Sequence, residues 1–272
     1  MIDDCEQAAT EGRRLVLAWE RFCKTVKHRR RYLFIHDTYK WADEIPVSQV
    51  LEELGAVAAR RELVRKLPSE TIIFRMRIRT RYERPSGPLD LGPPPIHCTV
   101  ANRMSPAGIS LFYGALDANT AWDETFSIKR SLSGRRRKYE YGTLAQWKTN
   151  RELRLLDLAR LPEGPMLNGT LQGWYRGEVP FLIAFKESIR KPVVLDGREH
   201  LDYVPTQIIC EYFQHVFFDQ GGDPLDGILY PSSVRSGGTC VVLFIGHDDF
   251  LGFRPEPLPI DLLASSIRHV RK

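Results

Sequence analysis

The sequence predicts an α+β fold, in which a small helical segment precedes a larger domain built around a mixed sheet. Residues 11–30 carry apolar side chains at the three-to-four spacing of an amphipathic helix, whereas residues 72–78 read as a strand. Beyond residue 71, strand and helix patterns mix without a strict βαβ rhythm. This order favours α+β over a doubly wound sheet.

The N-terminal segment is expected to be all-helical. The first helix places four apolar side chains on one face: Leu15, Trp19, Phe22 and Val26. A second helix starts near Pro46 and ends near Gly55, and a third runs on to residues 67–68. We therefore expect two domains, residues 1–68 and 69–272.

The second domain alternates strands and helices. The expected strands are residues 72–78, 109–115, 153–158, 227–230 and 239–245. The expected helices are residues 118–126, 180–189 and 205–217.

Composition excludes several classes of protein. With 272 residues, 43% of them hydrophobic and 27% charged, the chain matches a globular protein rather than a disordered or fibrous one. It lacks a run of about 20 apolar residues, and its first residues do not follow the pattern of a signal peptide. We expect a cytoplasmic protein without a membrane partner.

Cysteines, histidines and charge are not organised into a recognisable site. The five cysteines are scattered and form no C-x-x-C pair, so neither a disulfide framework nor a zinc site is expected. The net charge of +5 is mild for a nucleic-acid binder. The basic runs at residues 27–31 and 134–138 are not interleaved with aromatic residues, and we interpret them as solvated.

Residues 102–124 hold the densest set of chemically useful side chains. The common dinucleotide, triphosphate, esterase and protease motifs are absent from the sequence. Here Arg103 precedes an apolar strand that contains Tyr113, and Glu124 follows on a short helix. Such a set suits phosphates, a flat ring and a ribose. The alternative is a structural ion pair between Arg103 and Glu124 beside a core tyrosine.

Residues 226–244 form a second candidate feature. Two short apolar strands are joined by a loop rich in Pro, Ser and Gly, which predicts a hairpin with Ser232 and Ser233 at its mouth. Their hydroxyls are able to bind a ligand there. Taken alone, the segment is also compatible with an ordinary polar β-turn.

Together the two features resemble the RES-domain family, named for its arginine, glutamate and serine. In that family a tyrosine follows the arginine by ten residues and a glutamate follows the tyrosine by eleven, as Arg103, Tyr113 and Glu124 do here. The segment Gly-Ile-Leu-Tyr-Pro-Ser, which ends at Ser232, matches a later family motif.

The resemblance extends to flanking positions and departs at one of them. Either Arg75 or Arg77 matches an arginine near the start of the family's domain, and residues 205–207 resemble a helix start. The N-terminal helices resemble a HEPN-like domain of some RES proteins. The departure lies around Arg103, where the family's flanking glycine and aromatic residue are replaced and Ser105 stands for asparagine.

The resemblance implies a fold similar to ADP-ribosyltransferases and an activity that consumes NAD⁺, with no further cofactor. The cysteines and histidines show no ligand spacing, so no metal is expected. RES proteins are typically toxins of toxin–antitoxin pairs, silenced by an Xre-type antitoxin. A homo-oligomer or a complex with the antitoxin is therefore expected.

The family's residue roles carry over as expectations. Arg103, helped by Arg75 or Arg77, would hold the diphosphate, and Tyr113 would pack against nicotinamide. Glu124 would anchor the ribose and stabilise the developing charge. Ser232 and Ser233 would complete the pocket. The resemblance implies that the bond cleaved is the N-glycosidic bond of nicotinamide.

Two other functions remain open at this level. A HEPN ribonuclease uses an arginine and a histidine at short spacing, and both Arg31 with His36 and Arg21 with His28 fit loosely. A catalytically silent interaction protein on a RES scaffold is the other alternative.

Overall fold

The computed structural model describes residues 2–34, 45–132, 141–161, 179–190, 199–218, 222–254 and 256–272. Its longer helices are α1 (Ile2–His28), α2 (Val50–Arg60), α4 (Ala118–Leu132), α5 (Val179–Arg190) and α7 (Val204–His215). Shorter turns of helix are η2 (Val47–Gln49), α3 (Pro88–Leu91), η3 (Ile96–Cys98), α6 (Glu199–Asp202), α8 (His247–Phe250) and η4 (Ala264–Ser266).

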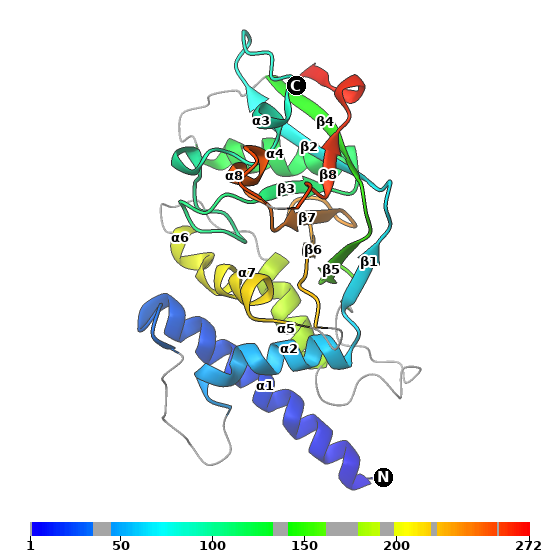
Figure 1. The fold of residues 1–272 in the computed structure, drawn as a ribbon. Coiled ribbons are helices and arrows are strands. Elements are labelled where there is room, and N and C mark those ends of the chain that lie inside the picture. Colours follow the sequence, from blue (N-terminus) through cyan, green and yellow to red (C-terminus); the bar gives the residue numbers. More distant parts are fainter. Residues whose placement is uncertain are drawn as a thin grey trace.

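The strands form one mixed sheet at the centre of the molecule (Figure 1). They are β1 (Val64–Leu67), β2 (Ile72–Arg79), β3 (Phe112–Ala115), β4 (Tyr141–Thr149), β5 (Leu153–Asp157), β6 (Gly227–Pro231), β7 (Thr239–Leu243), β8 (Ile260–Leu262) and β9 (Arg268–Arg271). Their order is β1-β5-β6-β7-β3-β2-β4-β8, with β9 also paired to β4. Only β5 and β6 run parallel among the described pairs. The α+β prediction is confirmed.

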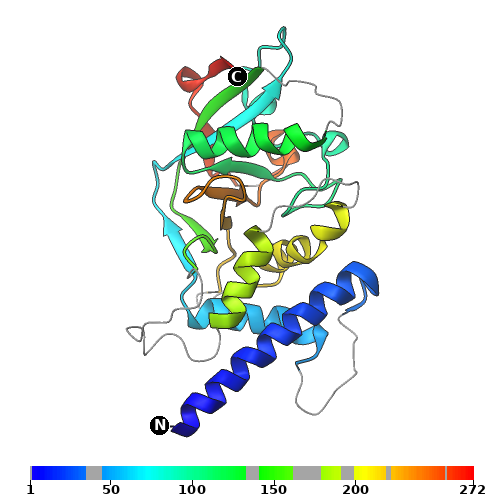
Figure 2. The same cartoon turned by 180° about the vertical axis from the view of Figure 1, so that it is seen from behind.

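Two separate groups of helices cover one face of the sheet. Val242 and Ile228 on this face pack in a cluster with α1, α2, α5 and α7, while Met76 and Ala115 pack with α4. Figure 2 shows α4 crossing the sheet above α5 and α7. The same face therefore contacts both helix groups, with α4 against β2, β3 and β7, and with α5 and α7 against β6.

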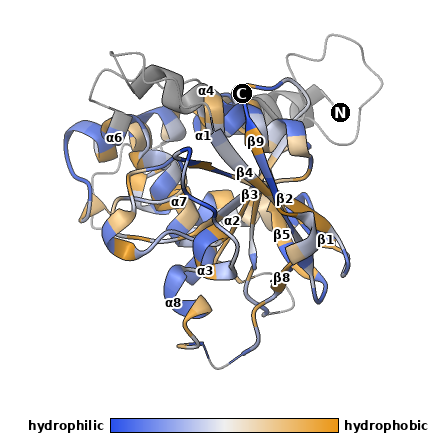
Figure 3. Ribbon diagram, turned by 90° about the horizontal axis from the view of Figure 1, so that it is seen from above, coloured by the Kyte–Doolittle hydropathy of each residue, from blue (hydrophilic) through white to orange (hydrophobic). Residues whose placement is uncertain are grey.

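The opposite face has its own core. Phe112, Val241 and Trp147 belong to a second buried cluster, and Phe250 of α8 packs against it. In Figure 3, α4 and α7 each carry both hydrophobic and hydrophilic residues, as expected of helices with one buried and one solvent-facing side.

The N-terminal helices share a core with the rest of the chain. Trp19 and Phe22 of α1 and Leu54 of α2 belong to the same buried cluster as Phe185 of α5 and Phe213 of α7. The rings of Trp19 and Phe185 meet edge to face, with centroids 5.2 Å apart. The apolar stripe predicted on the first helix is therefore buried against α5 and α7.

One element of the N-terminal segment was predicted wrongly. Instead of a third helix ending near residue 67, the chain leaves α2 at Arg60 and forms strand β1, which pairs antiparallel with β5. Val64 and Leu67 lie opposite Leu156 and Leu153, so pairing with the sheet overrides the local helix pattern. Residues 1–68 are consequently not all-helical.

Most expected elements of the second domain are present, and β4, β8 and β9 were missed. The inward positions of β4 include Thr143, Ala145 and Thr149, which are buried although they are small or polar. Trp147 is the one large buried side chain among positions 143, 145, 147 and 149, so the strand gives little alternation of apolar and polar residues to detect. The basic run at residues 134–138 lies outside the described residues.

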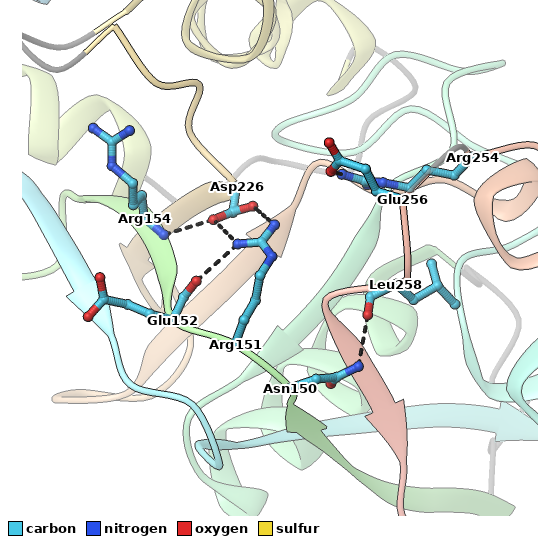
Figure 4. Close-up of polar contacts among 8 residues, drawn as sticks. All are labelled: Asn150, Arg151, Glu152, Arg154, Asp226, Arg254, Glu256 and Leu258. Atoms are coloured by element: carbon cyan, nitrogen blue, oxygen red, sulfur yellow. Dashed lines mark hydrogen bonds and ion pairs between the residues drawn. The ribbon is translucent and has the colours of Figure 1, made fainter.

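An ion pair fixes the turn between β4 and β5 against the start of β6 (Figure 4). Arg151 donates to both carboxylate oxygens of Asp226, at 2.9 and 2.5 Å, and the backbone N–H of Arg154 donates to the same carboxylate at 2.9 Å. Nearby, the side-chain amide of Asn150 donates to the carbonyl of Leu258 at 2.8 Å. These contacts hold the start of β6, at the end of that strand away from the turn that joins it to β7. No described helix is both long and apolar enough to cross a membrane.

Candidate functional site

Glu124 is carried by α4, and the start of that helix is well fixed. Asp117 accepts hydrogen bonds from the backbone N–H of Thr120 at 2.8 Å and from its hydroxyl at 2.6 Å. Burial opposes ionisation of Asp117, but these hydrogen bonds outweigh it and lower the pKa. The cap fixes the helix two turns before Glu124.

The hairpin between β6 and β7 holds the Glu124 carboxylate. The hydroxyl of Ser232 donates to Oε1 of Glu124 at 2.6 Å, and the backbone N–H of Ser233 donates to the same oxygen at 3.1 Å. Arg235 in this turn pairs with Asp123 of α4 at 2.9 Å. The predicted hairpin is confirmed, with both serines at its mouth.

Ser232 is buried, with 4% of its surface exposed. Besides donating to Glu124, its hydroxyl oxygen accepts the backbone N–H groups of Val234 at 3.2 Å and of Arg235 at 3.0 Å. The hydroxyl therefore makes three hydrogen bonds within the protein, one of which holds Glu124. Ser233 reaches Glu124 through its backbone.

Arg103 lies in a loop that is tied to the start of α7. The hydroxyl of Thr206 donates to the carbonyl of Arg103 at 2.5 Å, and the side-chain amide of Gln207 donates to the carbonyl of Asn102 at 2.8 Å. The Arg103 guanidinium lies over the ring of Tyr203, 5.8 Å from its centroid. The residue is half-buried.

Tyr113 projects from β3 next to this loop. Its hydroxyl shares a 2.9 Å hydrogen bond with the hydroxyl of buried Ser105. Burial raises the pKa of Tyr113, and the Ser105 bond opposes that shift only in part. The ring is therefore neutral at physiological pH and offers a polarised aromatic surface.

Tyr230 and Cys240 connect these parts. They lie directly opposite each other on β6 and β7, on the sheet face that carries Tyr113. Burial raises the pKa of both groups; in each case the charge of Glu124 raises it further and that of Arg103 lowers it. Both charges thus lie within electrostatic reach of one cross-strand pair.

The structure brings Glu124 of α4 into direct contact with Ser232 of the hairpin, and Tyr113 of β3 into contact with Ser105, two residues after Arg103. The charges of Glu124 and Arg103 both act on the Tyr230–Cys240 pair between them. Tyr230 and Cys240 were missed as site residues. Tyr230 lies two residues from buried Ile228, and Cys240 lies two residues from buried Val242. Because residues two apart on a strand share a face, this spacing is the signal that places them on this face.

Arg75 and Arg77 lie elsewhere. The Arg75 guanidinium packs over the ring of Phe112, 5.1 Å from its centroid, on the face opposite Tyr113. It donates to the carbonyls of Tyr113 at 2.5 Å and of Gly92 at 2.8 Å. Arg77 is exposed and donates to the carbonyl of Asp90.

Arg75 thus supports the strand of Tyr113 from behind. Burial, followed by repulsion from Arg77, lowers its pKa to about 10, so it stays a cation at physiological pH. The structure does not bring either arginine into the group formed by Arg103, Tyr113 and Glu124.

The two residue pairs of the ribonuclease alternative are described only in part. Arg21 is half-buried on α1 and His28 is exposed in its last turn, while His36 lies outside the described residues. No group of three or more His, Cys, Asp or Glu side chains in the described ranges is placed to hold a metal ion.

Comparison with protein families agrees with this geometry. The model of the RES domain matches residues 74–263, which includes every residue of the group described above. The chain belongs to the RES-domain family. No curated protein matches the sequence.

The RES match begins inside β2, so α1, α2 and β1 precede it. They are nevertheless packed into the core of the RES domain through α5, α7 and β5. The segment that precedes the family match is therefore structurally continuous with the RES domain.

Proposed function

We propose that this RES domain cleaves the N-glycosidic bond between nicotinamide and ribose in NAD⁺, with no cofactor besides this substrate. One observation carries the proposal. Glu124 is held through Oε1 by Ser232 and by the backbone of Ser233, and the charges of Glu124 and Arg103 both act on the Tyr230–Cys240 pair, which lies on the sheet face of Tyr113. An anionic group, a cation and a neutral aromatic ring are thus available to one dinucleotide.

The chemistry asks mainly for positioning and electrostatic stabilisation. Nicotinamide leaves as a neutral molecule, taking the electron pair of the broken bond, and positive charge develops at the anomeric carbon of the ribose. The carboxylate of Glu124 stabilises that charge and accepts hydrogen bonds from the ribose hydroxyls through Oε2. Because Ser232 orients the carboxylate in advance, little reorganisation is needed during the reaction.

Arg103 and Tyr113 act on binding. A guanidinium makes bidentate hydrogen bonds to phosphate oxygens, which suits Arg103 to the diphosphate. The ring of Tyr113 packs against the flat nicotinamide, and its raised pKa keeps it uncharged there.

The acceptor determines the reaction class. Attack by water gives ADP-ribose and a proton, attack by phosphate gives a phosphorylated ADP-ribose, and attack by a protein side chain transfers the group. Glu124 serves all three, because bond breaking requires no base.

The experiment follows NAD⁺ and its products with purified protein, with and without phosphate. Glu124→Gln is expected to lower kcat by on the order of 10²-fold or more, as for the loss of one electrostatic stabiliser. Glu152→Gln is the matched control, because Glu152 is an exposed carboxylate that pairs with Lys66 at the far edge of the sheet. Unchanged NAD⁺ with the wild-type protein would refute the proposal, and NAD⁺ binding without turnover would favour a silent scaffold.

We further propose that the protein is the toxin of a toxin–antitoxin pair and acts on the cytoplasmic NAD⁺ pool. Its partner is an Xre-type antitoxin, in a complex or alongside a homo-oligomer. The family membership supports this. Expression should deplete cellular NAD⁺ and arrest growth, whereas Glu124→Gln should do neither; growth arrest with intact NAD⁺ would point to another activity.

A further inference from the structure

We infer that Thr206 and Gln207, at the start of α7, are positioning residues that set the geometry of Arg103 and Tyr113. This inference rests on the proposed function, since it concerns how the same site binds NAD⁺. Neither side chain need touch the substrate. They act through the loop of residues 102–105.

Thr206 holds the backbone of Arg103 itself. Its hydroxyl donates to the Arg103 carbonyl at 2.5 Å and also lies 3.0 Å from the carbonyl of Tyr203. Thr206 is buried, with 4% of its surface exposed. Without the Thr206 hydroxyl, the Arg103 carbonyl would lose this partner, so the loop would have to move to find another.

Gln207 closes the same loop from its two ends. Its side-chain amide donates to the carbonyl of Asn102 at 2.8 Å and to that of Ser105 at 3.1 Å. The backbone N–H of Asn102 in turn donates to the carbonyl of Ser105 at 2.8 Å. One buried amide therefore fixes both residues that flank Arg103 and Met104.

The effect extends to Tyr113 through Ser105. The hydroxyl of Ser105 shares a 2.9 Å hydrogen bond with that of Tyr113. Because Gln207 fixes the backbone of Ser105, it also fixes the group that orients the Tyr113 ring. Two of the proposed NAD⁺-binding side chains consequently depend on one turn of α7.

The start of α7 is itself rigidly placed. Ile209, Cys210 and Phe213 of this helix are buried in the large core cluster that also contains α1 and α5. Just before it, Asp202 pairs with Lys27 of α1 at 2.8 Å. The N-terminal helices thus help to define where Thr206 and Gln207 stand relative to the sheet.

A positioning role and a purely structural role make different predictions. If the contacts only stabilise the fold, their loss lowers the melting temperature and leaves the kinetics of the folded protein unchanged. If they position Arg103 and Tyr113, their loss weakens substrate binding in protein that is still folded. The KM for NAD⁺ then rises while kcat changes little, because Glu124 is held by a separate hairpin.

The test compares Thr206→Val, which keeps the shape but removes the hydroxyl, with Thr206→Ser, which keeps the hydroxyl. NAD⁺ consumption is measured over a range of NAD⁺ concentrations, and melting curves are recorded for each protein. Thr206→Val should raise KM about 10-fold with kcat within about threefold of wild type, since small displacements of binding groups cost this much or more. Thr206→Ser should restore KM to within about twofold.

Gln207→Met gives an independent second variant, which removes both amide donors at similar volume and should raise KM by a similar factor. Asn150→Ala is its control, because Asn150 makes the same kind of amide-to-carbonyl bond at the distant turn in Figure 4. Asn150→Ala should leave KM at the wild-type value.

The outcomes separate the two proposals. If the wild-type protein consumes NAD⁺ and KM is unchanged in both Thr206→Val and Gln207→Met, the positioning role is wrong and the proposed function stands. The same holds if Thr206→Ser shows the full defect of Thr206→Val. If the wild-type protein does not consume NAD⁺, the proposed function fails first, and the inference fails with it.

Discussion

The hydroxyl of Ser232 donates a 2.6 Å hydrogen bond to Oε1 of Glu124, although 108 residues separate them in the chain. The hydroxyl oxygen also accepts two backbone N–H groups of its own turn. Ser232 therefore couples the β6–β7 hairpin to α4. This arrangement makes the serine of the RES domain a support for its glutamate, with its own surface turned away from solvent.

Ser232→Ala should lower kcat about 10-fold and change KM by less than about threefold. The substitution removes the bond that orients the carboxylate but leaves the Ser233 N–H in place, so the stabilising charge remains with a looser orientation. Steady-state kinetics of NAD⁺ consumption measure both constants. Ser266→Ala is the control, because Ser266 also accepts a backbone N–H and donates to a carbonyl, in a turn beside β4. A change confined to KM would place Ser232 in direct contact with the substrate.

Arg75 and Arg77 should differ sharply when replaced. Arg75→Met leaves the carbonyls of Tyr113 and Gly92 without their guanidinium donor, so it should destabilise the fold by about 2–3 kcal/mol and also raise KM through Tyr113. Arg77→Met removes an exposed contact to Asp90 and should change stability by less than about 0.5 kcal/mol. Urea unfolding measures the stability of both variants. Equal losses of stability in the two variants would mean that Arg77 contributes as much to stability as Arg75, although it is exposed.

The sequence was sufficient for the parts of the site that depend on motif spacing. Arg103, Tyr113 and Glu124 follow the spacing of one family, and the Pro/Ser/Gly loop between two short apolar strands predicts the hairpin of Ser232. The charges of Glu124 and Arg103 both act on the Tyr230–Cys240 pair, which supports the hypothesis that these residues act together. The roles assigned to each residue stay predictions.

Other features depend on contacts that local patterns do not encode. Arg75 of β2 lies over Phe112, on the sheet face opposite Tyr113, because of how the strands pair. The sequence alone does not give this pairing, so it could not show which face Arg75 and Arg77 occupy. β4 buries threonines that satisfy their hydroxyls by tertiary hydrogen bonds, such as Thr149 with the carbonyl of Pro68. β1 forms because β5 offers an edge to pair with. Each of these is a long-range effect that overrides local propensity.

The partly buried Cys23 should make stability fall at alkaline pH. Burial raises the pKa of its thiol from 9.0 to about 12, and the charge of Lys27 opposes this only in part. The unfolded chain therefore loses this proton at lower pH than the folded protein does. The stabilising contribution is full below pH 9 and is lost as the pH rises towards 12.

Urea unfolding at pH 7, 8, 9 and 10 measures this dependence. Above pH 9, Cys23→Ala should reduce the pH slope of the unfolding free energy by up to about 1 kcal/mol per pH unit. Cys98→Ala is the comparison, because Cys98 is exposed. If Cys23→Ala and wild type lose stability in parallel, Cys23 does not contribute to the alkaline slope.

Phe22→Ala should destabilise the whole molecule and not the N-terminal helices alone. Phe22 is fully buried, and its ring stacks with Trp19 at 5.4 Å and meets Phe34 edge to face at 5.5 Å. These rings belong to the core that includes α5, α7 and the sheet. Truncating such a ring typically costs about 3–5 kcal/mol.

The fluorescence of two tryptophans reports on the two parts of the molecule separately. Trp19 lies in α1, whereas Trp147 lies in the core on the opposite face of the sheet. In single-tryptophan variants, urea unfolding followed by fluorescence should give coincident transitions, both shifted by Phe22→Ala. Leu17→Ala, at an exposed position of the same helix, should shift neither by more than about 0.5 kcal/mol. Two separate transitions, with only that of Trp19 moved, would show that residues 1–68 fold as an independent domain. In that case the continuous core between α1 and the RES domain would contribute little to stability, and removing the N-terminal segment would leave the site intact.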